Sequence, residues 1–116
     1  MNIRFLPSSI HNILDYMAAL VLVVAPVILK FDQVSPFAYW LSIVAGIALI
    51  LYSLLTDYEF SIKKWIPFET HLISDLSIGV IFLVWPFIFG FSGLAFAYYI
   101  VMGLSLLLVV AVTKPK

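Results

Sequence analysis

Four apolar stretches dominate this sequence, and each is close to the length that a helix needs to cross a membrane. They cover residues 10–31, 37–55, 70–91 and 95–112, and about 20 apolar residues suffice for one span. Transmembrane strands are a poor alternative, because the alternation of lipid-facing and lumen-facing side chains is missing. We therefore expect an all-α bundle of four transmembrane helices that forms a single domain, residues 1–116.

The composition excludes the common soluble functions. With 65% hydrophobic and 10% charged residues, a soluble chain of this size would expose large apolar patches. Six basic and six acidic residues cancel, so no basic field attracts nucleic acid. Cysteine is absent, and no Gly-rich phosphate loop, nucleophile elbow or metalloprotease motif is present. We expect the lipid bilayer as partner, no enzymatic activity, no catalytic residues and no cofactor.

The distribution of basic residues predicts the orientation in the membrane. Only Lys30 lies beside an outer turn. The other five basic residues lie in the N-terminal tail, the middle loop and the C-terminal tail: Arg4, Lys63, Lys64, Lys114 and Lys116. Because cytoplasmic loops carry an excess of Lys and Arg, we expect both termini in the cytoplasm. Tyr52, Tyr58 and Trp65 are expected in the inner aromatic belt, where loop 57–69 solvates the inner face.

The chain contains an internal repeat at an offset of 60 residues. Eight of 28 aligned positions are identical over residues 4–31 and 64–91: Pro7/Pro67, His11/His71, Ile13/Ile73, Asp15/Asp75, Val24/Val84, Pro26/Pro86, Ile28/Ile88 and Phe31/Phe91. A one-residue deletion then aligns residues 38–40 with residues 97–99. The sequence therefore predicts two tandem two-helix hairpins, repeat 1 over residues 4–57 and repeat 2 over residues 64–114. Two spans in each repeat predict parallel pseudo-two-fold symmetry about the membrane normal.

These features resemble the SPW-repeat membrane proteins over nearly the whole chain. That family's two-helix unit begins with His-x-x-x-Asp and carries a Ser-Pro-Trp-like motif followed by Gly-Phe. The matching residues are His11 with Asp15, His71 with Asp75, Pro26 with Phe31, Pro86 with Gly90-Phe91, and the segment 54–58. The signature departs at Ala25-Pro26-Val27 and at Trp85-Pro86-Phe87. The resemblance implies a small bacterial or archaeal integral membrane protein and supplies no catalytic residues.

Two prolines lie eleven residues beyond the two aspartates. Pro26 and Pro86 each free the carbonyl four residues earlier, that of Leu22 or Phe82. In hydrocarbon such a carbonyl needs a donor from a neighbouring helix or a wet cavity. We expect Pro26 and Pro86 to kink their helices into the outer turns, with a hinge or binding cavity as the alternative.

The two His-x-x-x-Asp pairs carry the sharpest chemical signal. A spacing of four places both side chains of a pair on one helix face, and the pseudo-two-fold axis could bring His11, Asp15, His71 and Asp75 into one polar cluster. Three interpretations are open: a structural clamp, a proton or ion pathway, and a site for a divalent transition metal. Sequence alone does not establish that the pairs meet, and we expect no bound metal.

Two further expectations concern local structure. Ser8 or Ser9 and Thr70 are candidate N-caps, which would place His11 and His71 at the headgroup level. Small residues predict close helix approach: Ser42, Ala45, Gly46, Ala48, Gly79 and Gly103. Because Ala19 aligns with Gly79, we expect these two residues where the first and third helices meet.

We expect a non-enzymatic membrane module, for example an accessory or assembly subunit. This expectation rests on the absence of a soluble domain and of a reaction motif. The alternative is a small transporter or channel that uses the His–Asp pairs, and a membrane enzyme with a His/Asp metal site comes third. Four helices leave little room for a sealed pathway, so transport predicts a homo-oligomer or a larger membrane complex.

Overall fold

Four long helices make up most of the protein. The computed structural model describes residues 3–114. The α-helices are α1 (Ser8–Ile28), α2 (Pro36–Leu54), α3 (Phe68–Phe89) and α4 (Gly93–Val112), and a short 3-10 helix, η1 (Phe31–Gln33), precedes α2. All four α-helices are long and apolar enough to span a membrane. The expected all-α bundle of four spans is confirmed.

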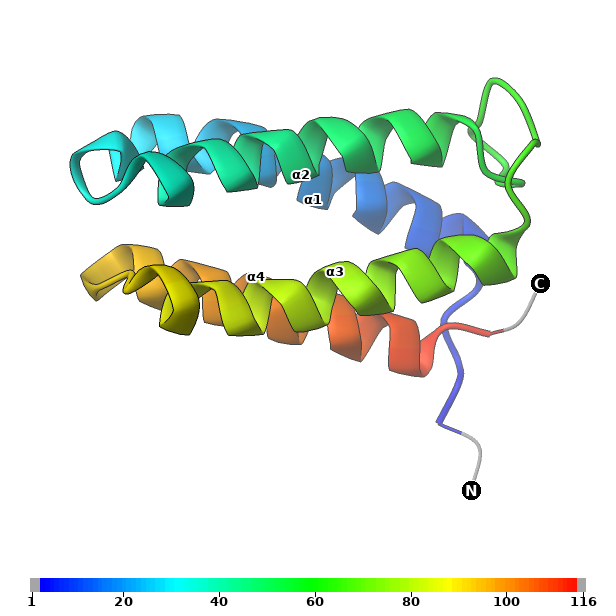
Figure 1. Ribbon diagram of the computed structural model, residues 1–116. Helices are drawn as coiled ribbons and strands as arrows, with labels where there is room; N and C mark the ends of the chain where they lie inside the picture. The colour runs from blue at the N-terminus through cyan, green and yellow to red at the C-terminus, as the bar shows by residue number, and fades with distance from the viewer. Residues whose placement is uncertain (1–2, 115–116) are drawn as a thin grey trace.

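The helices form two layers (Figure 1). Helix α1 packs mainly against α2, and α3 packs mainly against α4, so each layer is one hairpin. Loop 55–67 and both ends of the described chain lie at one end of the bundle, and the two short turns lie at the other. Segments 60 residues apart in sequence therefore lie at equal depth.

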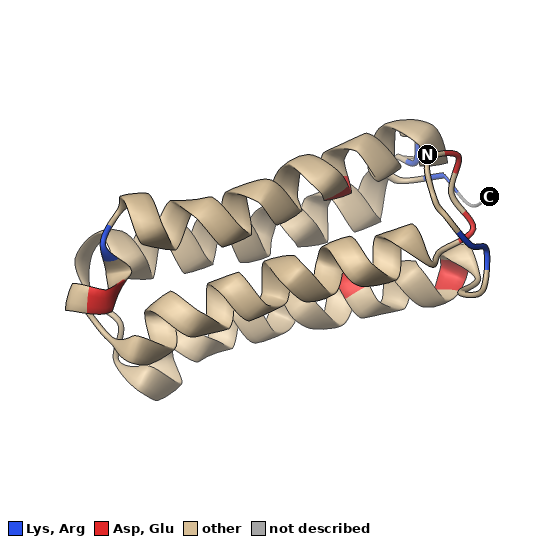
Figure 2. Cartoon of the chain, turned by 90° about the horizontal axis from the view of Figure 1, so that it is seen from above, with Lys and Arg blue, Asp and Glu red and all other residues tan. Residues whose placement is uncertain are grey.

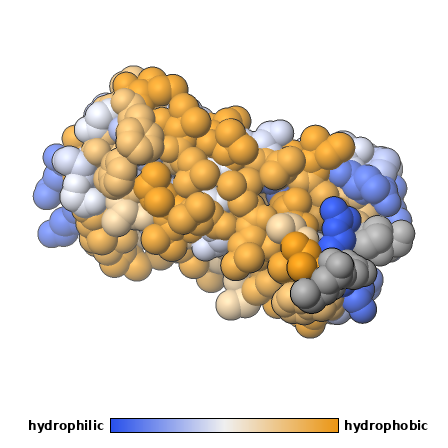
Figure 3. Space-filling view, turned by 90° about the horizontal axis from the view of Figure 1, so that it is seen from below, coloured by the Kyte–Doolittle hydropathy of each residue, from blue (hydrophilic) through white to orange (hydrophobic). Residues whose placement is uncertain are grey.

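The surface has the character expected in a bilayer. Figure 2 shows Lys and Arg confined to the two ends of the bundle. Figure 3 shows an apolar surface over the helices, with hydrophilic side chains at both ends. The apolar middle matches the hydrocarbon core, and the polar ends match the headgroup layers.

Buried positions recur in both hairpins. In α1 and α3 they are 60 residues apart: His11, Asp15, Ala19, Leu22 and Pro26 against His71, Asp75, Gly79, Phe82 and Pro86. In α2 and α4 they are 57 residues apart: Ala38, Ser42, Gly46 and Leu49 against Ala95, Tyr99, Gly103 and Leu106. The predicted one-residue deletion is therefore wrong, because the offset falls by three residues, from 60 to 57, across the second turn. The pseudo-two-fold axis itself stays a prediction.

The two outer turns explain this difference in length. The first turn places Lys30 in the left-handed region at φ 58° and then forms η1. The second turn spans only residues 90–92, between α3 and α4. It uses positive φ at Gly90 (66°) and at Gly93 (59°), which glycine adopts without steric cost.

Small residues bring the helices of each hairpin together. A Cβ on Gly46 would lie 2.9 Å from the carbonyl oxygen of Ala19, and one on Gly103 would lie 2.9 Å from that of Gly79. Close approach is therefore confirmed for these glycines. Ala19 and Gly79 each contact the glycine of their own hairpin, and their expected place between α1 and α3 stays a prediction.

Helices α1 and α3 begin two residues before the predicted spans. Their N-caps are Pro7 and Pro67, without a side-chain cap, so the expected caps at Ser8, Ser9 and Thr70 are wrong. The fixed φ of proline suits the entry to a first turn. The oxygens of Pro7 and Pro67 accept hydrogen bonds from the backbone of His11 (3.1 Å) and of His71 (3.2 Å). The side chains of both histidines are fully buried, and their depth relative to the headgroups stays a prediction.

Candidate functional site

The two His–Asp pairs meet in the core. His11 and Asp15 project from α1, His71 and Asp75 project from α3, and each is at most 2% exposed. One potential ligand atom from each residue lies within 4.8 Å of all the others. The structure thus answers the question that sequence left open, and we name these four residues the His/Asp quartet.

The quartet is an alternating ring of imidazole nitrogens and carboxylate oxygens. Between the hairpins, His11 Nε2 lies 3.0 Å from Asp75 Oδ2, and His71 Nε2 lies 2.6 Å from Asp15 Oδ2. Within each helix the Nε2 to Oδ2 distances are longer, 3.3 Å in α1 and 3.2 Å in α3. Each histidine is therefore closer to the aspartate of the other hairpin.

Two threonines fix the histidine ring orientation. The Nδ1 atom of His11 lies 2.7 Å from Thr113 Oγ1, and that of His71 lies 2.8 Å from Thr56 Oγ1. Both hydroxyls donate their single proton to a helix carbonyl, Thr113 to Val109 and Thr56 to Tyr52. Since the hydroxyl proton is already used, Nδ1 of each histidine must be the donor. Each Nδ1 therefore carries a proton, and each Nε2 faces the carboxylates.

The chain crosses between the repeats to place these threonines. Isolated parallel bridges pair Leu6 with Thr113 and Ile66 with Thr56. The backbone of Lys114 donates to the oxygen of Leu6 (2.8 Å), and that of Asp57 donates to the oxygen of Ile66 (2.9 Å). The start of each repeat is thus held by the end of the other, which sets each threonine beside the histidine of the opposite hairpin.

Two tyrosines complete the hydrogen bonds of the carboxylates. Tyr52 of α2 donates to Asp75 Oδ1 at 2.5 Å, and Tyr58 of loop 55–67 donates to Asp15 Oδ2 at 2.8 Å. Burial, together with the nearby carboxylate of Asp15, raises the pKa of Tyr58, so its hydroxyl keeps the proton that it donates. Tyr58 is fully buried. Its expected place in the aromatic belt is wrong, and loop 55–67 does more than solvate the inner face.

Aromatic rings shield the quartet from water. The ring centroid of Phe68 lies 5.8 Å from that of His11, and the ring centroid of Tyr58 lies 4.8 Å from that of His71. Phe68 is only 2% exposed. In such a dry environment the attraction between the charged groups is stronger than in water, and so is the cost of an unbalanced charge.

The negative charge of the two converging carboxylates must be balanced by protons or by a cation. Each short Nε2 to Oδ2 contact between the hairpins requires one proton, whichever of the two atoms holds it. In this arrangement the ring of four side chains therefore holds two protons in addition to the two on the Nδ1 atoms. A single divalent cation would supply the same charge, because neutral imidazole presents its Nε2 lone pair to the centre.

Pro26 and Pro86 lie away from the quartet, in the outer halves of α1 and α3. Both are buried, and their helices end at Ile28 and Phe89 soon after them. The carbonyl of Leu22, which Pro26 frees, accepts a hydrogen bond from Ser42 Oγ at 2.7 Å. The expected donor from a neighbouring helix is therefore confirmed for Leu22, and the kinks stay predictions.

Several site residues were not predicted from sequence. Thr56 and Thr113 carry a faint signal, because each follows the second helix of its repeat and they are 57 residues apart. Asn12 is fully buried, and its Oδ1 accepts from the backbone of Phe60 at 3.0 Å, which holds loop 55–67 on the site. Tyr58 lies in the segment 54–58 that resembles the family, but by residue type neither Tyr58 nor Asn12 differs from the polar residues of an ordinary loop or helix start.

Comparison with known families identifies the fold unit. The family model for the SPW repeat domain matches residues 9–113, which include the quartet and both threonines. A comparison with curated proteins found no match, and neither did one with solved structures. The four apolar helices agree with an integral membrane protein. On this match over almost its whole length, the chain belongs to the SPW repeat family.

Proposed function

We propose that this protein is a non-enzymatic membrane module that holds one divalent transition metal ion in the His/Asp quartet. The observation that carries this proposal is the convergence of two imidazole Nε2 atoms and two carboxylates, one pair from each hairpin, in a buried position. Imidazole with carboxylate suits zinc, iron and manganese.

The surroundings of the quartet support a metal site. Metal-bound histidines usually donate their second N–H to a neighbouring acceptor, which fixes the ring and its tautomer. Thr113 and Thr56 accept that hydrogen bond here. Tyr52 and Tyr58 orient the carboxylates in the same way. All four ligands thus have an outer partner, as a site built for one ion requires.

The distances and the charge also suit an ion. In a tetrahedral zinc site with bonds of about 2.1 Å, neighbouring ligand atoms lie about 3.4 Å apart. The four ring contacts are 2.6 to 3.3 Å and all ligand atoms lie within 4.8 Å of one another, so side-chain movements of about 1 Å bring them to that spacing. A divalent ion that replaces the two shared protons leaves the buried charge unchanged. Four protein ligands close the coordination shell, as in structural zinc sites, which supports a holding role over catalysis.

Metal content of the purified protein tests the proposal. The chain has only two histidines, so purification through a tag without histidine keeps the analysis clean. We expect one divalent ion per chain, and zinc added to stripped protein should raise its melting temperature and release about two protons per ion. His11→Ala and His71→Ala should lose the ion, whereas Asp32→Asn, an exposed carboxylate in the outer turn, should keep it.

Two results would contradict a metal site. One is stripped parent protein that takes up no zinc at a ratio of one per chain while it remains folded. The other is stoichiometric zinc that survives both histidine substitutions. The first result would favour a quartet that holds protons only, either as a clamp between the hairpins or as a proton pathway.

We also propose that the module lies in a prokaryotic inner membrane with loop 55–67 in the cytoplasm. The five-to-one distribution of basic residues supports this orientation. Cysteine is absent from the chain, so single cysteines at the exposed positions Ile62 and Ser92 report cleanly. An impermeant thiol reagent on intact cells should label Ser92→Cys and spare Ile62→Cys, and the reverse pattern would overturn the orientation.

A further inference from the structure

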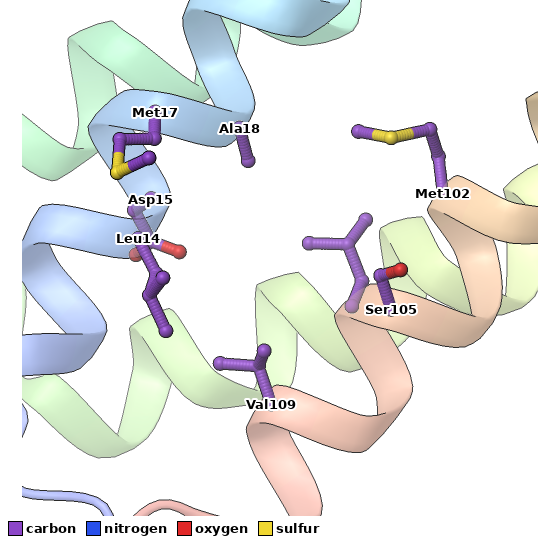
Figure 4. Close-up of a pocket in the computed structure, with 8 residues that line it drawn as sticks. Leu14, Asp15, Met17, Ala18, Met102, Ser105 and Val109 are labelled. Atoms are coloured by element: carbon purple, nitrogen blue, oxygen red, sulfur yellow. The ribbon is translucent and has the colours of Figure 1, made fainter.

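A cavity opens beside the quartet, between α1 and α4. Its volume is about 230 Å³, and its walls are largely apolar, with Leu14, Met17, Met102 and Val109 among the lining residues. Figure 4 shows these side chains around the space between the two helices, with the carboxylate of Asp15 at its wall. Met17 on the rim is 59% exposed, so the cavity is accessible from the lipid side.

One carboxylate oxygen of Asp15 is available to this cavity. Asp15 Oδ2 contacts Tyr58 and both histidines of the quartet. Within residues 3–114, no hydrogen bond reaches the other oxygen, Oδ1. The side chain is only 2% exposed. Oδ1 is not one of the fully buried polar atoms without a partner, which within the described residues are Asn12 Nδ2 and Ser53 Oγ, so it keeps a small opening, consistent with the cavity that Asp15 lines. An acceptor with so little access to water is stabilised by a donor placed in that cavity.

The opposite side of the quartet shows which donor fits. There Asp75 occupies the position of Asp15, and its Oδ1 accepts from the phenol hydroxyl of Tyr52 at 2.5 Å. At the offset of 57 residues that relates α2 to α4, Val109 takes the place of Tyr52. Valine has neither the ring nor the hydroxyl, so the cavity occupies the space that a tyrosine fills on the other side.

We propose that this cavity binds a lipid-soluble phenol whose hydroxyl donates a hydrogen bond to Oδ1 of Asp15. The aromatic ring lies between Met17, Met102 and Val109, and an apolar tail extends into the bilayer. The proposal goes beyond the metal site and rests on the cavity beside Asp15 and on the replacement of Tyr52 by Val109 at the equivalent position.

A neutral donor fits this site better than a cation. In the quartet, the two carboxylates are already balanced by two positive charges, whether two protons or one divalent ion. An ammonium group would add an unbalanced charge beside apolar walls, which is strongly unfavourable. A phenol or alcohol satisfies the acceptor without adding charge, and the ring fills an apolar space as the ring of Tyr52 does.

Binding of 4-octylphenol to metal-loaded protein in detergent micelles tests this site. Calorimetric titration against micelles alone removes the contribution of partitioning. We expect saturable binding at one phenol per chain, and at least tenfold weaker binding of 4-octylanisole, which has the same shape without the donor. Val109→Tyr should abolish binding, because it supplies the ring and hydroxyl within the chain. Val101→Tyr, at an exposed position of α4, should bind like the parent.

A second variant guards against a folding defect in Val109→Tyr. Ser105 also lines the cavity and is exposed, so Ser105→Phe should fill the space and weaken binding at least tenfold. Equal affinity for the phenol and its methyl ether, or unchanged binding in a folded Val109→Tyr or Ser105→Phe protein, would overturn the proposal. Metal content measured on the same samples distinguishes a failure of the phenol site from a failure of the metal site, because Val109→Tyr should retain its ion.

Discussion

The two sides of the His/Asp quartet differ, although equivalent helices and equivalent ring residues form both of them. On the side of α2 and α3, Tyr52 fills the space next to Asp75 and donates to it. On the side of α1 and α4, Val109 leaves a cavity next to Asp15, and Tyr58 reaches that carboxylate from loop 55–67 instead. The ring of histidines, aspartates and threonines is matched on both sides. What differs is the access to the bilayer.

The contacts that hold the two hairpins together are the same on both sides of the quartet, and the residues next to those contacts differ. The matched contacts couple the hairpins, because each histidine contacts the aspartate and the threonine of the other repeat. The unmatched residues, Tyr52 and Val109, do not alter that ring. A repeat protein can therefore keep matched contacts at both interfaces between its repeats while the residues beside those contacts, here Tyr52 and Val109, differ.

Loss of a quartet carboxylate should have the largest effect. Asp15→Ala and Asp75→Ala each leave the buried charge of the ring unbalanced, and we expect either to lower the free energy of unfolding by about 3 to 5 kcal/mol. Reversible unfolding in detergent measures the loss. Asp15→Asn and Asp75→Asn remove the same charge but keep the shape and an acceptor oxygen for the tyrosine, so the difference between the alanine and asparagine variants separates the loss of packing and hydrogen bonding from the loss of charge. A parent-like stability in either alanine variant would show that the ring does not couple the hairpins.

Replacing Tyr52 by valine, the residue at the equivalent position 109, should have the next largest effect. Tyr52→Val removes the hydrogen bond to Asp75 and leaves a cavity, so we expect a loss of about 3 kcal/mol. It should also create a second site for 4-octylphenol, which the same titration would reveal. Tyr52→Phe removes only the hydroxyl and should cost about 1.5 kcal/mol without a second site. Should the valine variant bind one phenol as before, the two sides are not equivalent pockets.

The threonines should affect metal affinity more than stability. Thr56→Val and Thr113→Val remove the acceptor of Nδ1–H at His71 and at His11, and we expect each to weaken zinc binding about 10- to 100-fold. The cost in unfolding free energy should be only about 1 kcal/mol. Competition with a chelator of known affinity measures the first quantity. Thr113→Ser keeps the hydroxyl and should bind zinc like the parent. Unequal losses of zinc affinity in Thr56→Val and Thr113→Val would show that the two threonines are not equivalent.

The sequence was sufficient for the helices and for the centre of the site. Hydrophobic length alone located four spans, and the rare residue types inside them, His11 and Asp15 with His71 and Asp75, marked the quartet. Charged and imidazole groups are costly in a membrane, so their presence there is informative. The resemblance to the SPW-repeat proteins, based on these residues, is confirmed.

Other features of the site could not be predicted from the sequence, because the residue types that form them are common at such positions. A threonine after a helix, a tyrosine in a loop and a small residue in a membrane helix each occur for many reasons. Tyr58 was misplaced because a belt tyrosine and a buried donor have the same sequence appearance. The contacts of Ala19 with Gly46 and of Gly79 with Gly103 were not predicted, because periodicity shows that a face is small without showing which helix covers it. Partner choice depends on three-dimensional packing.

The crossed pairing of the repeats has a consequence for biosynthesis. Because the start of repeat 1 is held by residues after α4, His11 obtains its threonine only when the fourth helix has entered the membrane. A chain that ends before α4 contains both His71 and Thr56, but it lacks Thr113, the hydrogen-bond partner of His11 Nδ1. The complete set of hydrogen bonds around the His/Asp quartet therefore requires all four helices.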